Sequence, residues 1–464
     1  MNNKEITRKV ARYIEAEGAE RIPPSVIDQA KYCLLEHLGA CLIGSSTLMS
    51  RLTFNLVKSL FPAGNCPLIG TDFQSNVLGA IWGNGVSGSS WDYDDGHRLP
   101  LRKAPVTQAL GHAAGHPGSV VIPSALAFAF DKSATGLKLL ESIVVGYEVG
   151  VRIASSRRPH TVLANATGNW GVFAAAVSAA KILELPARTI ENLLGVAAAN
   201  LINPPGRVVL QNMGMIKESI GWSGVTGAAS CLMAQSGITG LAEILDNEKF
   251  FDETFFEDLR ENYEIMKVYF KPYSSCRMSH PVIDAAISIR QDHGINVADI
   301  KRIVVKTSLK ALAMNNCEPR TIEEAQYSIP FCVATALKHG KVSPSVMQDC
   351  DLRDPIIHHL CAKVQIVQDE KQNRNQQEEA LFPRKTAGGI TVITEGGTFS
   401  AYSDCPKGDP ENPIGRGQLI EKFLESSQTK LSQKIAQEIL SFVLSIEEHK
   451  DLAALRSVLT ARQS

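Results

Sequence analysis

The spacing of apolar and polar residues predicts helices over most of the first half of the chain. Residues 25–42 and 135–153 place apolar side chains on one helical face, and residues 124–130 have a helical pattern too. Residues 169–183 and 188–202 are alanine-rich helical patterns. So many small residues favour helices that pack backbone close to backbone, so a buried bundle is expected.

Strand patterns occur only later in the chain. Residues 300–307, 362–367 and 389–394 have the composition of strands, and the turn 395–397 joins the last of them to residues 398–402 as a predicted hairpin. Further helical patterns lie at 323–339 and, after a proline-rich connector at 406–413, at 418–424, 432–446 and 452–459.

This order predicts a mainly α protein with an α+β part. We expect an α+β domain at residues 266–402, inserted between two parts of one large helical domain, residues 1–265 and 403–464.

Composition places the chain among ordinary globular proteins, with 44% apolar and 20% charged residues. The 47 basic and 48 acidic residues give a formal net charge of -1, which supports neither a nucleic-acid partner nor a polybasic membrane anchor. Two long uncharged stretches, 104–130 and 159–180, contain His, Pro, Asn or Gly at several points. They therefore indicate buried protein interior rather than a membrane span.

The ten cysteines are scattered, without a Cys-x-x-Cys pair or a Cys/His cluster at zinc or iron–sulfur spacing. We expect reduced thiols, mostly buried, and neither a metal nor another cofactor. The polar N-terminus lacks the apolar core of a signal peptide, so a cytoplasmic protein is expected.

An acidic cluster at residues 91–97, Trp-Asp-Tyr-Asp-Asp-Gly-His, lies between apolar segments and near several histidines. Carboxylates in apolar surroundings have shifted pKa values, so an Asp of this cluster is a candidate general base or a partner that holds a neighbouring His or Lys in place; a solvated acidic turn is the alternative interpretation. A calcium loop is rejected because the ligands alternate wrongly and Lys103 stands where a bidentate Glu is needed. The preceding residues 83–88 match G-x-G-x-x-G, but without a βαβ unit or a ribose-binding acid they indicate tight packing ahead of a functional loop, not NAD binding.

Basic residues from separate segments provide the second candidate chemistry. Taken singly, His116, His160 and Lys217 have ordinary turn or surface interpretations, and so has the segment 271–280 (Lys-Pro-Tyr-Ser-Ser-Cys-Arg-Met-Ser-His). Gathered at one place, they suit a di- or tricarboxylate, because each desolvated carboxylate needs charge-assisted donors.

Several motifs, in order, together resemble the MmgE/PrpD family, which includes 2-methylcitrate dehydratase, cis-aconitate decarboxylase and iminodisuccinate epimerase. The motifs are Asp92-Tyr93-Asp94-Asp95, His116-Pro117-Gly118 with Ile122-Pro123, Gly146-Tyr147-Glu148-Val149, Gly168-Asn169-Trp170-Gly171, Lys217, Lys271-Pro272-Tyr273 through His280-Pro281, and Pro406-Lys407-Gly408-Asp409-Pro410. The resemblance implies a homodimer, a large helical domain built from both ends of the chain, a smaller α+β lid domain, and a cofactor-free active site between them.

The resemblance also implies roles for individual residues. Asp92, His116, Lys217 and Lys271 match active-site positions, and His160 corresponds to a family histidine although its distance to Gly168 is altered. Substrate binding is expected from Lys217, Lys271, Cys276, Arg277 and His280. Two departures stand out: Gly96 lies where relatives often have Thr or Ser, and Cys276 where the decarboxylase has a catalytic histidine.

The leading hypothesis is a lyase that removes water from a hydroxylated tricarboxylate resembling 2-methylcitrate. Asp92 or His116 would take the proton next to a carboxylate, a histidine or lysine would protonate the departing hydroxyl, and Lys217, Lys271 and Arg277 would hold carboxylates. An epimerase of an iminodisuccinate-like dicarboxylate is an alternative. A cis-aconitate-type decarboxylase is less favoured, because Cys276 replaces the histidine and residues 311–319 hold no tyrosine. A scaffold that only binds a polyanion is the non-catalytic alternative.

Overall fold

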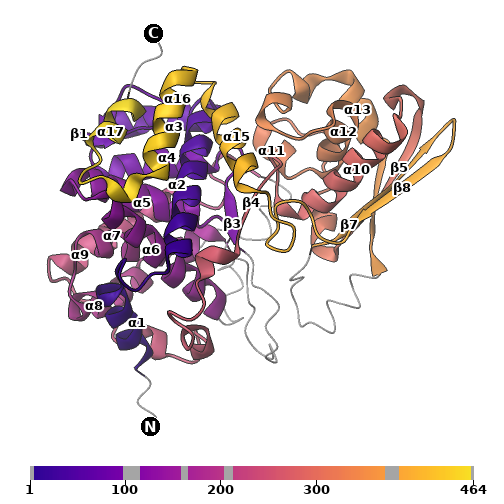
Figure 1. Cartoon of the computed structure of the whole chain (residues 1–464). Coiled ribbons are helices and arrows are strands. Elements are labelled where there is room, and N and C mark those ends of the chain that lie inside the picture. The colour runs from indigo at the N-terminus through magenta and orange to yellow at the C-terminus, as the bar shows by residue number, and fades with distance from the viewer. Residues whose placement is uncertain (1–4, 98–114, 158–165, 203–212, 371–385, 461–464) are drawn as a thin grey trace.

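The computed structural model describes residues 5–97, 115–157, 166–202, 213–370 and 386–460. The described residues form two large hydrophobic cores and a small cluster of Phe54, Val57 and Leu68. The larger core takes residues between Val10 and Phe270 and from Ile414 to Leu459, whereas the second takes residues from Tyr273 to Val392 together with Trp91 and Met213. Figure 1 shows the consequence: the C-terminal helices pack among the N-terminal ones, and the mixed unit stands beside them. The predicted class, a helical domain from both chain ends plus a smaller α+β domain, is confirmed, while the limits at 265/266 and 402/403 stay predictions.

The larger unit is built almost entirely of helices. They are α1 (Ile6–Ala16), α2 (Pro24–Gly44), α3 (Leu48–Leu60), α4 (Val77–Ser89), α5 (Gly118–Lys132), α6 (Gly136–Ser156), α7 (Thr167–Ile182), α8 (Ala187–Ala199), α9 (Ile220–Gln235), α15 (Arg416–Ser427), α16 (Gln433–Leu444) and α17 (Ala453–Leu459). Two short antiparallel pairs accompany them: β1 (Ala63–Pro67) with β2 (Gln74–Ser75), and β3 (Asp95–His97) with β4 (Val268–Phe270).

Small residues let these helices approach closely, as the alanine-rich patterns predicted. A side chain at Gly85 of α4 would lie 2.9 Å from the Cα of Gly221 on α9, so the two helices cross nearly backbone to backbone. Residues 83–88 thus lie inside α4, and their glycines pack closely against neighbouring segments. Helix α9 escaped prediction because its glycines lower helix propensity, which tertiary packing overrides.

The second unit packs helices against one sheet. Its helices are α10 (His280–His293), α11 (Ile322–Gln326), α12 (Ile329–His339) and α13 (Pro355–Cys361), and its strands are β5 (Ile300–Thr307), β6 (Val364–Gln368), β7 (Gly388–Thr394) and β8 (Thr398–Ser403). The sheet order is β6-β5-β7-β8, with β5 and β6 parallel and the other pairs antiparallel. The predicted hairpin is confirmed as β7–β8, whereas α10 was not predicted.

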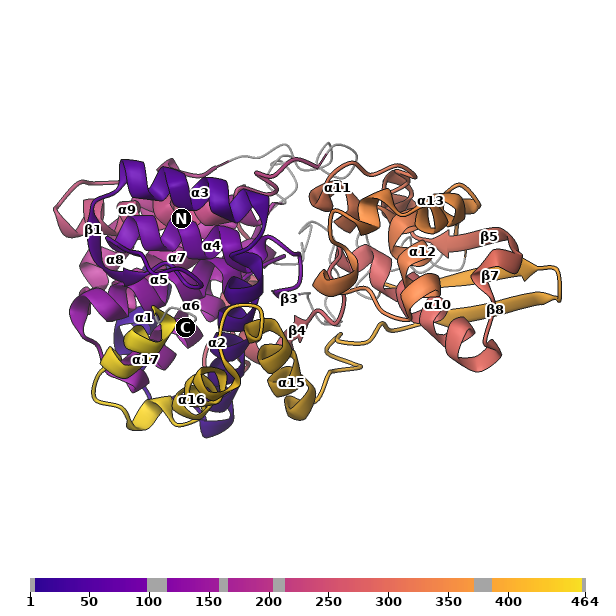
Figure 2. The same ribbon diagram turned by 90° about the horizontal axis from the view of Figure 1, so that it is seen from above.

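The contact between the two units positions the site. Figure 2 shows α15 and the β3–β4 pair on the side of the larger unit that faces the mixed unit. Trp91, just before β3, packs into the second core rather than the first. The chain segment that carries the acidic cluster therefore lies where the two cores meet.

In the part of the chain that the structure describes, no single helix is long and apolar enough to cross a bilayer. Helices α2 and α3 meet that criterion only as a pair bent by 93°.

Candidate active site

Four buried side chains form one hydrogen-bonded cluster: Asp92, Asp94, His116 and Lys271. Lys271 Nζ donates to Asp92 Oδ1 at 2.8 Å and to Asp94 Oδ1 at 3.3 Å, and it lies 3.4 Å from His116 Nδ1. His116 Nδ1 is 2.9 Å from both oxygens of Asp94, and its Nε2 is 3.5 Å from Asp92 Oδ1. Because a carboxylate only accepts, Nδ1 carries a proton. Three of the predicted catalytic residues are thus in direct contact.

The charges in this cluster support one another. Burial alone would raise the pKa of Asp92, but Lys271, Lys217 and His116 outweigh burial and hold that pKa below its ordinary value. Burial, the largest single cause, lowers the pKa of His116, but the charge and hydrogen bond of Asp94 together with the charge of Asp92 outweigh it, so the pKa is raised overall. Likewise, the two aspartates overcome burial and raise the pKa of Lys271. The resting cluster is therefore two carboxylates, an ammonium and an imidazole biased towards its protonated form.

One oxygen in the cluster is left without a partner. Asp92 Oδ2 is buried and has no hydrogen-bond partner among the described residues, while Oδ1 faces Lys271 and His116. An unsatisfied buried carboxylate oxygen costs free energy, and such groups concentrate where a ligand completes the site.

Asp92 is positioned by contacts that hold the C-terminal end of α4. The last carbonyls of a helix have no partner inside it. Lys217 Nζ donates to Ser89 O at 2.8 Å and to Ser90 O at 3.1 Å, and Gln326 Nε2 also donates to Ser90 O, at 3.0 Å. Ser274 Oγ holds the next carbonyl, that of Trp91. Residues from three distant segments thus fix the chain just before Asp92.

Backbone strain marks the same place. Asp92 has φ 51° and Lys217 has φ 45°, both in the left-handed region that non-glycine residues seldom adopt. Strain of this kind persists only where the surroundings enforce it, and it clusters at functional sites. Lys217 is buried, and burial lowers its pKa although Asp92 opposes the shift. The predicted catalytic lysine 217 therefore lies beside the cluster without a direct bond to it among the described contacts.

The three aspartates of the acidic motif have different partners. Asp94 accepts from His116, Lys271 and Ser119 Oγ (2.6 Å), so it orients the imidazole. Asp95 accepts from the amide of Gly118 at 2.8 Å and from Tyr147 Oη at 2.5 Å, which ties β3 to the start of α5 and to α6. Asp94 was missing from the predicted site residues, although its position two residues after Asp92 in the same motif was a usable signal.

Gly96 has a physical reason to lack a side chain. It lies directly opposite Tyr269 in the β3–β4 pair, and a Cβ at this position would be 2.2 Å from the Tyr269 ring. The buried phenol of Tyr269 thus takes the space that Thr or Ser would need. In this chain, the position opposite Tyr269 therefore suits a residue without a side chain.

The remaining predicted residues lie around the cluster rather than in it. Burial, with Asp92 as the next cause, raises the pKa of the Cys276 thiol to about 11, so this thiol is neutral and near Asp92. Arg277 donates to Asp409 (2.8 Å from Nε) and to Thr386 (2.7 Å). His280 Nε2 faces Ser275 O at 3.1 Å, and burial lowers its pKa to about 3. His160 lies outside the described residues.

A cation position already exists at the centre of the cluster. Asp92, Asp94 and His116 each offer one ligand atom, and these atoms lie within 4.8 Å of one another, a spacing that suits a metal ion. The Lys271 ammonium, however, is within hydrogen-bonding distance of the same groups. A metal ion would have to displace a cation that the protein itself supplies.

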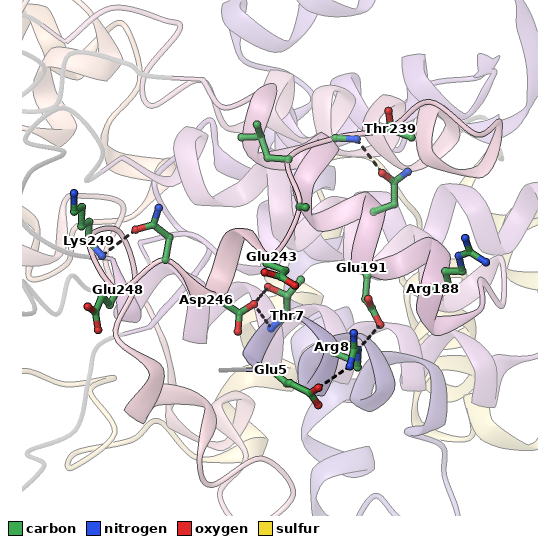
Figure 3. A pocket seen from close by; sticks show the side chains of 15 residues that line it. Glu5, Thr7, Arg8, Arg188, Glu191, Thr239, Glu243, Asp246, Glu248 and Lys249 are labelled. Atoms are coloured by element: carbon green, nitrogen blue, oxygen red, sulfur yellow. Dashed lines mark hydrogen bonds and ion pairs between the residues drawn. The ribbon is translucent and has the colours of Figure 1, made fainter. Parts of the chain in front are cut away.

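A large cavity lies elsewhere, between α1, α8 and residues 239–249 (Figure 3). It measures about 1140 Å³ and contains none of the predicted site residues. One of its charged groups stabilises the fold, since Asp246 accepts from the amide of Ile6 at 2.6 Å and from Thr7 Oγ1 at 2.5 Å. Asp246 thus caps the N-terminus of α1, which has no side-chain cap of its own.

A buried group of carboxylates, imidazole and ammonium groups is typical of an enzyme that moves protons on an anionic substrate. Two family models match the chain: the MmgE/PrpD N-terminal domain over residues 8–263 and the MmgE/PrpD C-terminal domain over residues 273–448. The chain therefore belongs to the MmgE/PrpD family, and the resemblance inferred from the motifs is confirmed.

Curated relatives match along almost their whole length. Cis-aconitate decarboxylase from Homo sapiens is 23% identical over 493 residues, covering 98% of this chain and 95% of that protein. The cis-aconitate decarboxylase-like protein oryM from Aspergillus oryzae is 23% identical, with 98% and 97% covered. Cis-aconitate decarboxylase from Aspergillus terreus is 22% identical, with 98% and 96% covered. The family thus includes lyases, of which these relatives are carboxy-lyases by name.

Proposed function

We propose that the protein is a cofactor-independent lyase acting on a small di- or tricarboxylate, and that it removes water from a 2-methylcitrate-like hydroxy acid. The observation that carries the proposal is Asp92 Oδ2, the buried oxygen without a partner among the described residues, next to an imidazole biased towards protonation. A free carboxylate oxygen and a held proton in one cluster are the two halves of acid–base catalysis.

The proposed roles follow from the contacts. Asp92 Oδ2 takes the proton from the carbon next to a substrate carboxylate. His116, oriented by Asp94, gives its Nε2 proton to the departing hydroxyl, so the C–O bond breaks and water leaves. Lys271 and Lys217 stabilise the negative charge that develops on the carboxylate, because ammonium groups in a water-poor site act strongly on such charge. The pKa directions favour Asp92 as the base and His116 as the acid, which narrows the two alternatives that the sequence left open.

The cationic groups beside Asp92 support an anionic substrate. Three groups that can carry positive charge, Lys217, Lys271 and His116, lie around two carboxylates, Asp92 and Asp94. Glu323 also acts on Lys217, so the charges are close to balanced, but an entering carboxylate can pair with the ammonium groups and the imidazole, which offsets part of the cost of its desolvation.

Decarboxylation of cis-aconitate is the second candidate, because the curated relatives carry that name. Loss of carbon dioxide would leave a carbanion that His116 protonates, with the same lysines stabilising the charge. Cys276 weighs against it: a thiol with a pKa raised to about 11 is a much weaker acid than the protonated histidine expected at that position. An epimerase would share the first step of the dehydratase and return the proton to the opposite face.

One experiment separates these activities. Purified protein is incubated in deuterated water with 2-methylcitrate, citrate, cis-aconitate and iminodisuccinate stereoisomers, with and without EDTA, and products are followed by NMR. New alkene signals from a hydroxy acid support the dehydratase. Release of carbon dioxide from cis-aconitate supports the decarboxylase, whereas deuterium incorporation with inversion and no alkene supports the epimerase. Loss of turnover with EDTA would contradict the metal-free site, and binding without any conversion would favour the scaffold.

A further inference from the structure

Lys422 brings the C-terminal segment into the wall of the candidate site. This lysine lies on α15, and its side chain is only 10% exposed. Its Nζ donates to Glu36 Oε1 on α2 at 2.8 Å, to Tyr93 O at 2.5 Å and to Lys271 O at 3.0 Å. Three acceptors use all three protons of the ammonium.

The two carbonyls that Lys422 binds belong to the segments that carry the reacting groups. Tyr93 stands between Asp92 and Asp94, and Lys271 carries the central ammonium. The β3–β4 pair already holds these two segments together, and Asp95 opposite Phe270 is the strand pair nearest to the cluster. Lys422 bridges the two segments one step beyond this pair, at Tyr93 and Lys271.

The buried carboxylate of Glu36 explains why the Lys422 ammonium is tolerated in the wall of the site. Its side chain is 2% exposed, and burial raises its pKa although Lys422 opposes the shift. A buried ion pair contributes little net stability compared with apolar side chains of the same volume. An ion pair alone needs no contact with the two carbonyls, so the carbonyl bonds point to a second role.

We infer that Lys422 is a positioning residue: it fixes the carbonyls of Tyr93 and Lys271 at one point and thereby keeps Lys271 Nζ at bonding distance from Asp92. This inference rests on the proposed function, since it takes Asp92 and Lys271 as reacting groups. Its recognisable effect is on kcat, because a misplacement of about 1 Å in a reacting group lowers the rate on the order of a hundredfold.

The test separates positioning from stability with two variants. Lys422→Met leaves Glu36 buried without its partner, so both the free energy of unfolding and kcat are expected to fall. Glu36→Gln/Lys422→Met removes the buried charge as well, so stability recovers, but the carbonyls remain unheld and kcat stays at least about tenfold below wild type. Recovery of kcat together with stability in the double variant would overturn the inference.

Lys31 provides the matched control. It lies on α2, its side chain is 9% exposed, and it also bonds a carbonyl of the C-terminal segment, Leu444 O at 3.0 Å, together with Glu447. Lys31→Met is expected to lower stability and leave kcat unchanged.

A crystal structure of the double variant supplies a readout that needs no substrate. We expect Lys271 Nζ and Asp92 Oδ1 to separate beyond the 2.8 Å of the wild type. An unchanged pair would contradict the inference. Activity in Asp92→Asn would instead refute the role of Asp92 as the base in the proposed function, whereas an inactive Asp92→Asn beside a fully active double variant would refute only the role of Lys422.

Discussion

Replacing Asp92 by asparagine tests the assignment of the base with little disturbance of the fold. Asparagine has the same shape, and it tolerates the left-handed backbone conformation that Asp92 adopts at φ 51°. The asparagine carbonyl oxygen can still accept a hydrogen bond from Lys271. The position of the unpartnered Asp92 oxygen is then taken by the uncharged amide group, which cannot accept a proton from the substrate. Proton abstraction is therefore removed while the hydrogen bond that orients the residue is retained.

The expected magnitudes for activity and stability differ widely. A general base contributes about 10²- to 10⁴-fold to the rate, so kcat is expected to fall by at least a hundredfold. Breaking a buried ion pair outright costs about 3–5 kcal/mol. Here Lys271 keeps Asp94 at 3.3 Å, so we expect a loss of about 1–2 kcal/mol in the free energy of unfolding.

The assay is exchange of substrate hydrogen for solvent deuterium, measured by NMR beside denaturant unfolding. Asp92→Ala is the informative second variant, because alanine in the left-handed region adds about 1–2 kcal/mol of destabilisation without a larger effect on exchange. Wild-type exchange in Asp92→Asn, with exchange abolished in His116→Gln, would show that His116 is the base and that the reasoning from pKa directions is wrong.

Three further predictions concern the surroundings of the site. Gly96→Ala places a Cβ 2.2 Å from the Tyr269 ring, so a loss of about 1–3 kcal/mol is expected in denaturant unfolding, and adding Tyr269→Ala should relieve part of it; simple additivity would refute the clash. Burial, with Glu36 as the next cause, raises the pKa of Asp95 to about 7, so the folded protein keeps a proton that the unfolded chain releases above pH 4 or so. Wild-type stability should therefore fall relative to Asp95→Asn as pH rises from about 4 to about 7, by on the order of 1 kcal/mol per pH unit, and a pH-independent difference in unfolding free energy would contradict this. The outer face of α3 exposes Leu48, Leu52, Leu56 and Leu60 beside Ile216 and Trp222, an apolar patch on the order of 500 Å² that a second copy of the chain is expected to cover. Light scattering should give twice the chain mass for the wild type and half that value for Leu52→Asp/Leu56→Asp, whereas Leu309→Asp should leave the mass unchanged, because Leu309 is a still more exposed leucine but lies in the other unit.

The sequence predicted the helices and strands of this protein better than the contacts between them. Periodicity identified α2, α6 and the β7–β8 hairpin, because each is long or has a distinct turn. It missed α9 and the helical state of residues 83–88, because glycine in a helix is disfavoured locally and is explained only by the close approach of α4 and α9. The acidic motif indicated a site, yet nothing in it distinguishes Asp92, which faces Lys271, from Asp95, which caps α5.

Several motifs that led to the family turn out to serve the site indirectly. Tyr147 binds Asp95, and the next residue, Glu148, accepts from the amide of Ile265 at 3.0 Å, just before β4. Asp409 of the C-terminal motif pairs with Arg277. Such partners are 52 to 132 residues apart in the chain, so no local pattern reveals them; only the fold does.

The arrangement as a whole explains how strained and unsatisfied groups persist at one place. Left-handed backbone at Asp92 and Lys217 costs about 1–3 kcal/mol at each position, and the unpartnered oxygen of Asp92 adds a cost of similar size. These costs are tolerated because the surrounding contacts leave the segment no alternative: Lys217 and Gln326 hold the end of α4, and Lys422 holds the carbonyl after Asp92. A substrate that hydrogen-bonds to Asp92 Oδ2 would remove part of the cost, so binding energy would be gained at the atom where the proton is transferred.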